Sequence, residues 1–280
     1  MTPEEARRAL DALGSLPDDE IATGEAALLL AAVDLPGVDL APARAALSAL
    51  AREAVAAAAA DPLADGGDAE ARRLLLAGLL HGMHGFAGDE ATYDDPANAN
   101  LVQVLERKRG LPVALGILWL HCAEALGWEV SGVGFPGHFL LSVAGTRGRR
   151  IVDPFGGGAA LDASELRALL KQVQGARAEL RPDMLHPVTR REVLLRLQNN
   201  LKLRRLRAGD LAGALAAAED MLRIAPDEAS LWREAALMNQ RLDRIGQALA
   251  CIERFLALAP SGAAAEEARA LADAWRARLN

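Results

Sequence analysis

The sequence has only two cysteines, Cys122 and Cys251, and they lie 129 positions apart. They form neither a disulfide framework nor a CxxC metal pair, which fits a protein of a reducing compartment. An excess of basic residues is also missing, since 31 Lys and Arg stand against 38 Asp and Glu and the net charge is -7. Phosphate binding favours a basic surface, so we expect no nucleic-acid partner.

Long apolar runs are absent as well. The longest are Ala26 to Val33 and, allowing Gly116, Val113 to Leu120. Both fall well short of the roughly 20 residues that a membrane span requires. The opening segment, MTPEEARRALDALG, carries two glutamates and no apolar stretch of the kind that a secretion signal needs. We therefore expect no contact with a membrane and a cytoplasmic location.

A 51% apolar composition is enough for a large buried core. Up to about residue 84, runs rich in alanine and leucine have helical spacing and are broken at 14–18, 36–39 and 61–68. This pattern predicts three or four helices. From Gly85 to Asn100 the composition changes to glycine, aspartate, proline and asparagine, which predicts a loop long enough to suspect function.

The central segment predicts one buried helix and a small sheet. Pro112 suits the first helical position, and the nearly all-apolar run behind it ends at Gly127. Three stretches with strand character follow, at 128–133, 138–143 and 150–152, and the short turns between them predict neighbouring antiparallel strands. A nucleophile at a helix start, followed by a histidine and a carboxylate on successive strands, serves thiol acyl-transfer chemistry. The helix dipole and the imidazolium lower the thiol pKa, while the carboxylate orients the histidine.

The last third contains an internal repeat of 34 residues. The first copy recurs 34 positions later at eight places: Leu203, Arg207, Ala214, Leu215, Ala216, Leu222, Ala225 and Pro226 reappear as Leu237, Arg241, Ala248, Leu249, Ala250, Leu256, Ala259 and Pro260. A helix-turn-helix unit of this length, with small residues where its helices touch and a closing proline, resembles the tetratricopeptide repeat. The sequence thus predicts two such units and a final helix near 263–279.

The runs VLERKRGLP, PGHF and VDPFGGG resemble the bacterial transglutaminase-like family of the SirB type, whose members join such a core to C-terminal tetratricopeptide repeats. The resemblance covers residues 75 to 280. It implies an α+β, mostly helical protein: a papain- or transglutaminase-like core with a small antiparallel sheet, then an all-α repeat segment. The implied parts are an N-terminal helical part (1–74), the core (75–185) and the repeats (186–280).

The resemblance also implies site residues. His138 of PGHF matches the catalytic histidine of the family, and Asp153 of VDPFGGG matches its aspartate. The nucleophile belongs at the start of the Pro112 helix, yet residues 109–118 contain no Cys, Ser or Thr, and Pro112 or Ala114 occupies the position. Neither side chain has a nucleophilic atom, so the covalent reaction of active relatives cannot run there.

Three polar residues ahead of that helix match polar positions of the family, and they could line the same cleft: Asn98, Asn100 and Glu106. Both asparagines equally suit capping and turn roles. Likewise, the pair formed by His138 and its aspartate can bind a ligand or simply tie two strands together.

Other candidate residues favour structural roles. Cys122 lies about 15 Å along the helix, near the end where the dipole raises a thiol pKa, so we expect a buried apolar residue. His81 and His84 have the spacing of a metal pair, but no third ligand follows, and we expect no metal or cofactor. Seven basic residues against one glutamate between Arg190 and Arg207 predict a solvated face or an interface to the acidic N-terminal part. Nucleic-acid binding is not expected, because aromatic residues are absent there.

Two functional hypotheses follow. The first is a non-catalytic interaction protein, a pseudoenzyme whose repeats bind a protein or peptide partner; a structural role within a larger assembly is not separated from it. The second is an enzyme of acyl-transfer or amide-hydrolysing type that activates water without the usual thiol. An open cleft holding Glu106 between His138 and Pro112 would favour the enzyme, whereas a cleft filled by Leu111 or Leu115 would exclude it.

Overall fold

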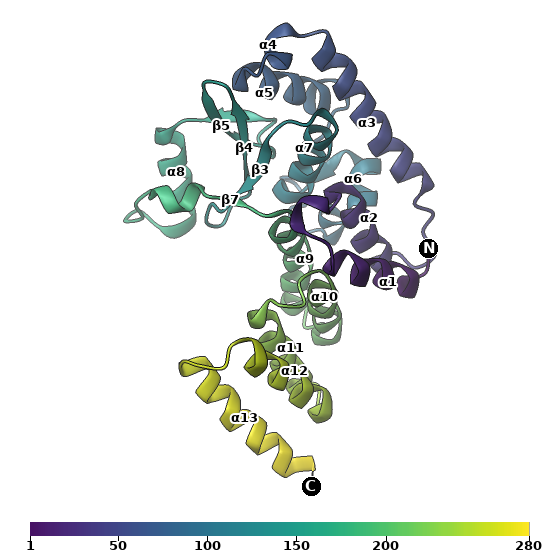
Figure 1. Cartoon of the computed structure of the whole chain (residues 1–280), viewed down its shortest axis with the longest axis vertical. Coiled ribbons are helices and arrows are strands. Elements are labelled where there is room, and N and C mark those ends of the chain that lie inside the picture. The colour runs from purple at the N-terminus through teal and green to yellow at the C-terminus, as the bar shows by residue number, and fades with distance from the viewer. Residues whose placement is uncertain (280) are drawn as a thin grey trace. The chain divides into compact units, whose positions relative to one another are not determined.

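The computed structural model describes residues 1–279 (Figure 1). These residues divide into two compact units. The first comprises Met1–Ala6 and Pro17–Leu197, and the second comprises Arg7–Leu16 and the chain from Gln198 onward. The division falls inside two helices, α1 (Pro3–Gly14) and α9 (Arg190–Arg207), so each of them contributes to both units.

Seven further α-helices belong to the first unit: α2 (Thr23–Asp34), α3 (Ala41–Ala59), α4 (Pro62–Asp65), α5 (Ala69–Ala77), α6 (Leu101–Arg107), α7 (Pro112–Leu126) and α8 (Ala163–Gln174). The prediction of three or four helices before residue 84 was wrong, because α4 forms inside an expected break. There the Asp61 carboxylate accepts hydrogen bonds from the N–H groups of Leu63 and Ala64, which caps a turn that begins at Pro62.

The sheet of the first unit has the strand order β6-β5-β4-β3-β7, and all neighbours are antiparallel. Its strands are β3 (Val130–Val133), β4 (Leu140–Gly145), β5 (Gly148–Asp153), β6 (Ala159–Leu161) and β7 (Pro187–Val188). The three expected neighbouring strands are thus confirmed. His138, however, precedes β4 instead of opening it. A separate parallel pair joins β1 (Ala87–Gly88) to β2 (Arg109–Gly110).

Both faces of the central strand β4 are covered, since its residues 140–143 are all buried. The ring of Phe139, just before β4, packs so closely on α7 that a Cβ at Gly116 would lie 2.3 Å from it. Leu140 belongs instead to an apolar cluster with Leu166 and Leu170 of α8. The helix α7 is itself buried nearly all round and ends at Gly127 with a φ of +64°, as its sequence predicts.

The second unit contains helices of the repeat: α10 (Leu211–Ile224), α11 (Ala229–Arg241), α12 (Ile245–Leu258) and α13 (Ala263–Leu279). The pairs α9–α10 and α11–α12, followed by α13, match the two predicted units and the final helix. The N-terminal helix α1 adds to this unit, because Arg7 pairs with Asp220 and Asp11 pairs with Arg223 of α10.

Candidate functional site

The site begins with a histidine just before β4 and an aspartate at the end of the neighbouring strand β5. In the register of β4 and β5, Leu141 lies opposite Val152, so the residues before β4 lie near the end of β5. His138 Nε2 lies 3.0 Å from Asp153 Oδ1, and the two side chains are 17% and 19% exposed. The two residues predicted from PGHF and VDPFGGG therefore form one hydrogen-bonded pair.

Asp153 is held in its ionised form. Burial alone would raise the pKa of this carboxyl, but the hydrogen bond and charge of His138 and the backbone N–H groups of Phe155 and Gly156 outweigh it. The pKa of Asp153 is therefore lower than its ordinary value of 3.8. The N–H of Phe155 donates to Oδ1 over 2.9 Å. Because an ionised carboxylate can only accept, His138 donates from Nε2, and in the neutral ring Nδ1 is then an acceptor; within residues 1–279 no hydrogen-bond partner reaches Nδ1.

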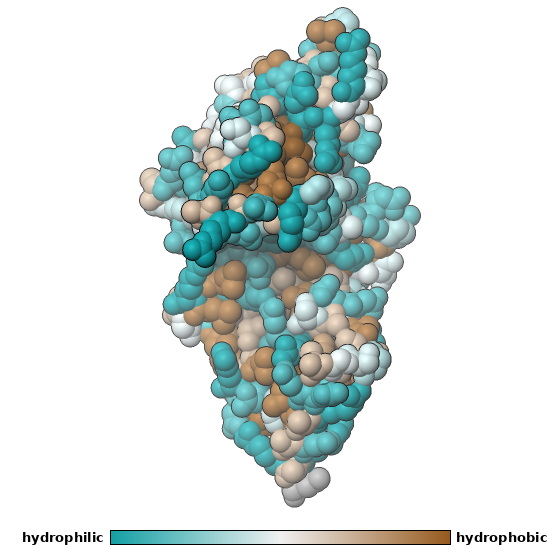
Figure 2. Space-filling view, turned by 90° about the vertical axis from the view of Figure 1, so that its left-hand side faces the viewer, coloured by the Kyte–Doolittle hydropathy of each residue, from teal (hydrophilic) through white to brown (hydrophobic). Residues whose placement is uncertain are grey.

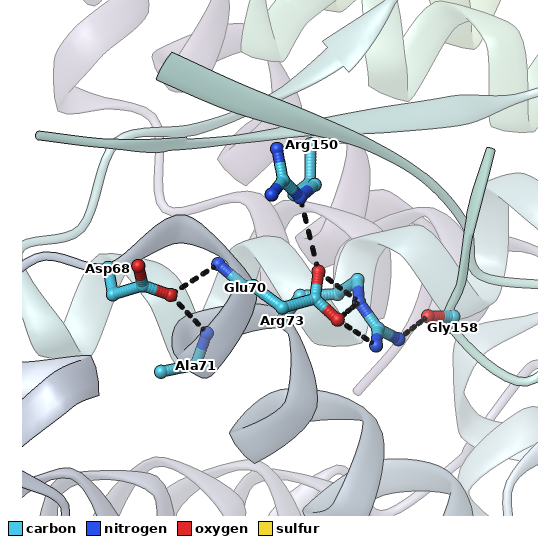
Figure 3. A network of polar contacts seen from close by, with 6 residues as sticks. All are labelled: Asp68, Glu70, Ala71, Arg73, Arg150 and Gly158. Carbon is cyan, nitrogen blue, oxygen red and sulfur yellow. Dashed lines mark hydrogen bonds and ion pairs between the residues drawn. The ribbon is translucent and has the colours of Figure 1, made fainter. Parts of the chain in front are cut away.

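A polar network, drawn in Figure 3 from Asp68 to Gly158, holds the turn that follows Asp153. Glu70 of α5 accepts hydrogen bonds from Arg73 and from Arg150 of β5. Arg73 also donates to the carbonyl of Gly158 over 2.6 Å, and the N–H of Gly158 donates to the carbonyl of Asp153. The hydrogen bond from Arg73 is the main reason that the pKa of Glu70 is lowered. The network thus ties α5 to the strand and to the turn behind it.

The loop between residues 85 and 100 places an aromatic side chain against Phe155, whose ring lies beside the pair. The ring of Phe155 meets the His138 ring edge to face, with centroids 6.5 Å apart, and Tyr93 packs edge-on against Phe155 at 5.9 Å. A Cβ at Gly88 would lie 2.6 Å from the Phe155 ring, so glycine is needed for this approach. A function for this loop stays a prediction, and the contact of Tyr93 with Phe155 is one that no local sequence pattern reveals.

The start of α7, where the family motifs predict the nucleophile, is apolar. Pro112 is its first residue, and both Pro112 and Ala114 are buried. Leu111 and Leu115 are each 1% exposed, whereas Glu106 is exposed at the end of α6. That Glu106, Pro112 and Ala114 line a cleft at His138 stays a prediction.

The two asparagines have the structural roles that were left open. Asn100 caps α6, since its Oδ1 accepts from the N–H of Gln103 over 3.3 Å. The backbone carbonyl of Asn98 accepts from the N–H of Leu111, and its side chain donates to the carbonyl of Thr92. Within the described part of the chain, Asn98 Oδ1 is buried and has no hydrogen-bond partner. Their part in lining a cleft stays a prediction.

Cys122 cannot replace the missing nucleophile. Its side chain is fully buried, and burial, aided by the charge of Glu53, raises the pKa of its thiol to about 12. A thiol with this pKa is almost entirely protonated at neutral pH and is inert. The prediction of a buried apolar residue is confirmed.

His81 and His84 form hydrogen bonds with different partners, so the two side chains are not arranged to bind one metal ion together. Trp119 of α7 donates its indole N–H to His81 Nε2 over 3.1 Å, so the other ring nitrogen donates to the carbonyl of Phe86 at 2.8 Å. Burial lowers the pKa of His81, against the hydrogen bond with Phe86 and the charge of Asp153. His84 instead pairs with Glu53 over 2.6 Å.

The basic stretch of α9 is engaged within the protein. The carboxylate of Asp18 accepts from the backbone N–H groups of Arg190 and Arg191, and this caps the helix. The side chain of Arg190 donates to the carbonyls of Asp19 and Ile21. Further along, Lys202 is buried and forms an ion pair with Glu234. The predicted interface to the acidic N-terminal part thus fits Arg190 and Arg191, whereas Lys202 pairs with a residue of α11.

Family profiles match both parts of the chain. The profile described as the transglutaminase-like superfamily matches residues 41–199, which include the helix from Pro112 and the pair of His138 and Asp153. The chain belongs to the transglutaminase-like superfamily. A tetratricopeptide-repeat profile matches residues 201–273, where α10 to α12 lie. The SirB type within the superfamily stays a prediction.

The relatives of this transglutaminase-like chain include proteins named UPF0162. One from Xylella fastidiosa (strain Temecula1) is 34% identical over 183 residues, which cover 63% of this chain and 64% of the relative. UPF0162 protein PA3419 of Pseudomonas aeruginosa is 33% identical, over 87% of this chain and 85% of its own. Human F-box only protein 21 is similar over a shorter part: 32% identity over 34% of this chain and 16% of that protein.

The transglutaminase-like domain thus contains a hydrogen-bonded pair of His138 and Asp153 and an apolar start of α7. Asp153 orients the His138 ring, which can accept a proton at Nδ1 or hold a polar group of a ligand. The first turn of α7 offers only carbon side chains, from Pro112 to Leu115. Over residues 1–279, none of the helices has both the length and the apolar character for crossing a membrane.

Proposed function

We propose that this transglutaminase-like chain is a cytoplasmic pseudoenzyme that acts by binding a protein or peptide partner. The observation that carries the proposal is the contrast within the site. His138 and Asp153 are in hydrogen-bond contact, while the helix start where the family has its nucleophile offers Pro112 and Ala114. Without a thiol or hydroxyl there, no covalent acyl intermediate forms.

The proposal assigns separate functions to the parts of the chain that the sequence predicts. Residues 75–185 hold the degenerate site, with His138 and Asp153 as its polar centre, and residues 186–280 bind the partner. Two observations support the second part. A tetratricopeptide-repeat profile matches the segment. Such repeats present extended surfaces that suit peptide and protein partners. Residues 1–74 complete the fold around them.

The experiment compares partner capture by three chains at equal concentration: the intact protein, His138→Ala and a chain that ends at Ala208. The shortened chain keeps the whole of α9, whose start is capped by Asp18. Captured proteins are identified by mass spectrometry, and thermal melting verifies that each chain is folded. We expect the shortened chain to lose a specific partner that His138→Ala retains. If a partner is captured by the intact and shortened chains but not by His138→Ala, the proposal is contradicted. The region around His138 and Asp153 would then be the functional site.

A hydrolase without a covalent thiol is the second candidate, and one observation favours it. His138 has its Nδ1 available within the described chain, and ionised Asp153 holds the ring in the tautomer that a general base needs. Hydrolysis of p-nitrophenyl acetate at pH 7.5 tests this candidate. If the rate falls by about 10²-fold or more in His138→Ala, the enzyme is the better interpretation; equal rates in both proteins support the pseudoenzyme.

A further inference from the structure

The strand β3 is paired along its whole length on one side and only in part on the other. β4 pairs with all of its residues from Val130 to Val133, whereas β7 pairs only with Gly132 and Val133. Arg190 would lie opposite Val130 if β7 continued in register, but its N–H donates to the carboxylate of Asp18 at the start of α9. The first half of β3 is therefore an open edge of the sheet.

The hydrogen bonds around β3 show which way the backbone of Val130 points. On one side, the N–H of Ala144 donates to the carbonyl of Glu129. On the other side, the N–H of Gly134 donates to the carbonyl of His186. In an antiparallel sheet every second residue of a strand bonds to the same neighbour. Val130 therefore directs its N–H and its carbonyl to the β7 side, as Gly134 does, and within residues 1–279 neither group has a hydrogen-bond partner.

The unpaired edge lies at a cavity. Val130 lines a space of about 390 Å³, which is in the size range of ligand sites. Leu120 of α7 and Val193 of α9 are almost fully buried and give this cavity an apolar lining. An open strand edge at a cavity is suited to an extended peptide, because the edge supplies backbone hydrogen bonds and the cavity accommodates side chains.

Surface hydropathy alone does not single out this place. In the view of Figure 2, hydrophobic residues reach the surface at several points among hydrophilic ones. Scattered apolar side chains are normal on a protein surface, whereas proteins usually protect the open edges of their sheets. The outer side of β7 has such protection, because Pro187 has no N–H to offer to another strand. The edge at Val130 has none.

The charges around the cavity favour a basic peptide. Three of the residues that line it are acidic, Asp18, Glu124 and Glu129, against a single arginine, Arg190. Arg190 already lies 3.6 Å from the carboxylate of Glu124. The side chain of Glu129 is exposed and has no ion pair within the described residues. The carboxyl end of α7 also lies here, and the helix dipole makes that end favourable for a cation.

The cavity is separate from the region around His138. Because β3 and β4 are antiparallel, the start of β4, which follows His138, lies beside the end of β3. Val130 is at the opposite end of that strand. All residues that line the cavity belong to the first unit, so the site is complete without the repeat helices α10 to α13.

We propose that the open edge of β3 at Val130 binds an extended peptide segment that carries a lysine or an arginine. The peptide adds a short antiparallel strand in line with β7 and exchanges two hydrogen bonds with the backbone of Val130. Its basic side chain lies near Glu129. This site is additional to partner binding by residues 186–280, and it does not depend on that proposal.

A random 12-residue peptide library displayed on phage tests the proposal. The library is depleted on the variant Val130→Pro and then selected on the intact parent chain. Proline removes the outward N–H of residue 130 but no hydrogen bond between β3 and β4, because Val130 and Val143 form a pair without hydrogen bonds. Thermal melting verifies that the variant is folded. We expect the selected peptides to be enriched in Lys and Arg.

Fluorescence anisotropy then measures the binding of a selected peptide. Val130→Pro should weaken binding about tenfold or more, because a carbonyl of the peptide loses its donor. Val130→Ala keeps both backbone groups and should bind almost as well as the parent. Glu129→Lys should weaken binding about threefold or more at low ionic strength. The matched control is Glu90→Lys, at an exposed glutamate without an ion pair in the described chain, and it should leave binding unchanged.

A second measurement leaves the protein unaltered. Each amide of the selected peptide is N-methylated in turn, which removes one N–H at a time. Strand addition predicts losses of about tenfold at one position or at two positions that lie two apart, because only every second peptide residue bonds to β3.

Four outcomes would overturn this inference: no selected peptide, unchanged binding by folded Val130→Pro, losses at consecutive N-methylated positions, or selected peptides without basic residues. None of them bears on the proposed function, because the capture experiment compares chains that all contain the edge at Val130. Loss of capture by the shortened chain, in turn, leaves this inference untouched.

Discussion

The family motifs predict one site from two regions: the pair of His138 and Asp153, and the start of α7. The two regions differ in chemical character. The pair is polar and is held from several sides, by the N–H of Phe155 and by the network of Glu70 and Arg73. The first turn of α7 contains apolar side chains only, and it is buried.

On the proposed function, the difference explains why a histidine and an aspartate are kept where the nucleophile is not. Asp153 has backbone partners and a buried neighbour that depend on its charge, so its removal costs stability whether or not a reaction runs. A nucleophilic side chain at the helix start would have no such structural role, because a small apolar side chain can fill the same space without a loss of stability. The predictions below test this contrast, from the largest expected effect to the smallest.

The strongest effect is expected in α7. Trp119 is fully buried, and its ring lies so close to Gly158 that a Cβ there would be 2.7 Å from it. Trp119→Ala should lower the free energy of unfolding by about 3–5 kcal/mol, because it leaves a cavity and removes the donor to His81. Urea denaturation followed by circular dichroism measures the loss. A loss below about 1 kcal/mol would mean that α7 is not the packed centre of the unit.

A smaller loss is expected when the polar pair is broken. Asp153→Ala leaves the N–H of Phe155 and the ring of His138 without their acceptor, so the free energy of unfolding should fall by about 1–3 kcal/mol. The same urea denaturation applies, with Asp162→Ala, an exposed helix cap elsewhere, as a comparison. If Asp153→Ala is as stable as the parent, the pair is kept for binding and not for structure.

The free energy of unfolding at acid pH should also depend on the carboxyl of Asp153. The folded-state pKa of Asp153 is lowered, so its contribution is full above its unfolded pKa, near 3.8, and is lost as the pH falls through the folded-state value. In Asp153→Asn, stability should therefore depend less steeply on pH below about 4. Urea denaturation at closely spaced pH values measures the slope. Parallel profiles for parent and variant would show that His138 and the backbone do not favour the ionised form.

The smallest effect is an expected lack of reaction at Cys122. With a thiol pKa of about 12 and no exposure, Cys122 should remain unlabelled by iodoacetamide at pH 8 in the folded protein. Cys251 is partly exposed and should react first, and both should react in urea. Peptide mass spectrometry locates the label. Rapid labelling of Cys122 in the folded state would reopen the question of a displaced nucleophile.

Sequence patterns predicted the features that depend on nearby residues. Pro112 and Gly127 marked both ends of α7, and the 34-residue spacing located the repeats. The strands β6 and β7 were missed because three and two residues are too few for an alternating pattern. The expected strand start at His138 was wrong for a related reason: the turn before β4 continues to Phe139, whose ring packs on α7.

The surroundings of the site could not be read from local patterns. The contact of Tyr93 with Phe155 and the hydrogen bond from Trp119 to His81 join residues 62 and 38 positions apart. Such contacts depend on the packing of the whole unit, so neither the composition nor the spacing of nearby residues predicts them. The His138 and Asp153 positions were recognisable only because their flanking motifs resemble a family.

The place of α1 in the second unit bears on how the chain is made. Arg7 contacts Asp220, which lies 213 positions later in the sequence. During synthesis the segment Arg7–Leu16 therefore leaves the ribosome long before its partners on α10. Contacts of such long range close slowly. The repeat unit therefore finishes folding late. Until then the segment Arg7–Leu16 lacks its partners on α10, at the stage where chaperones act on nascent chains.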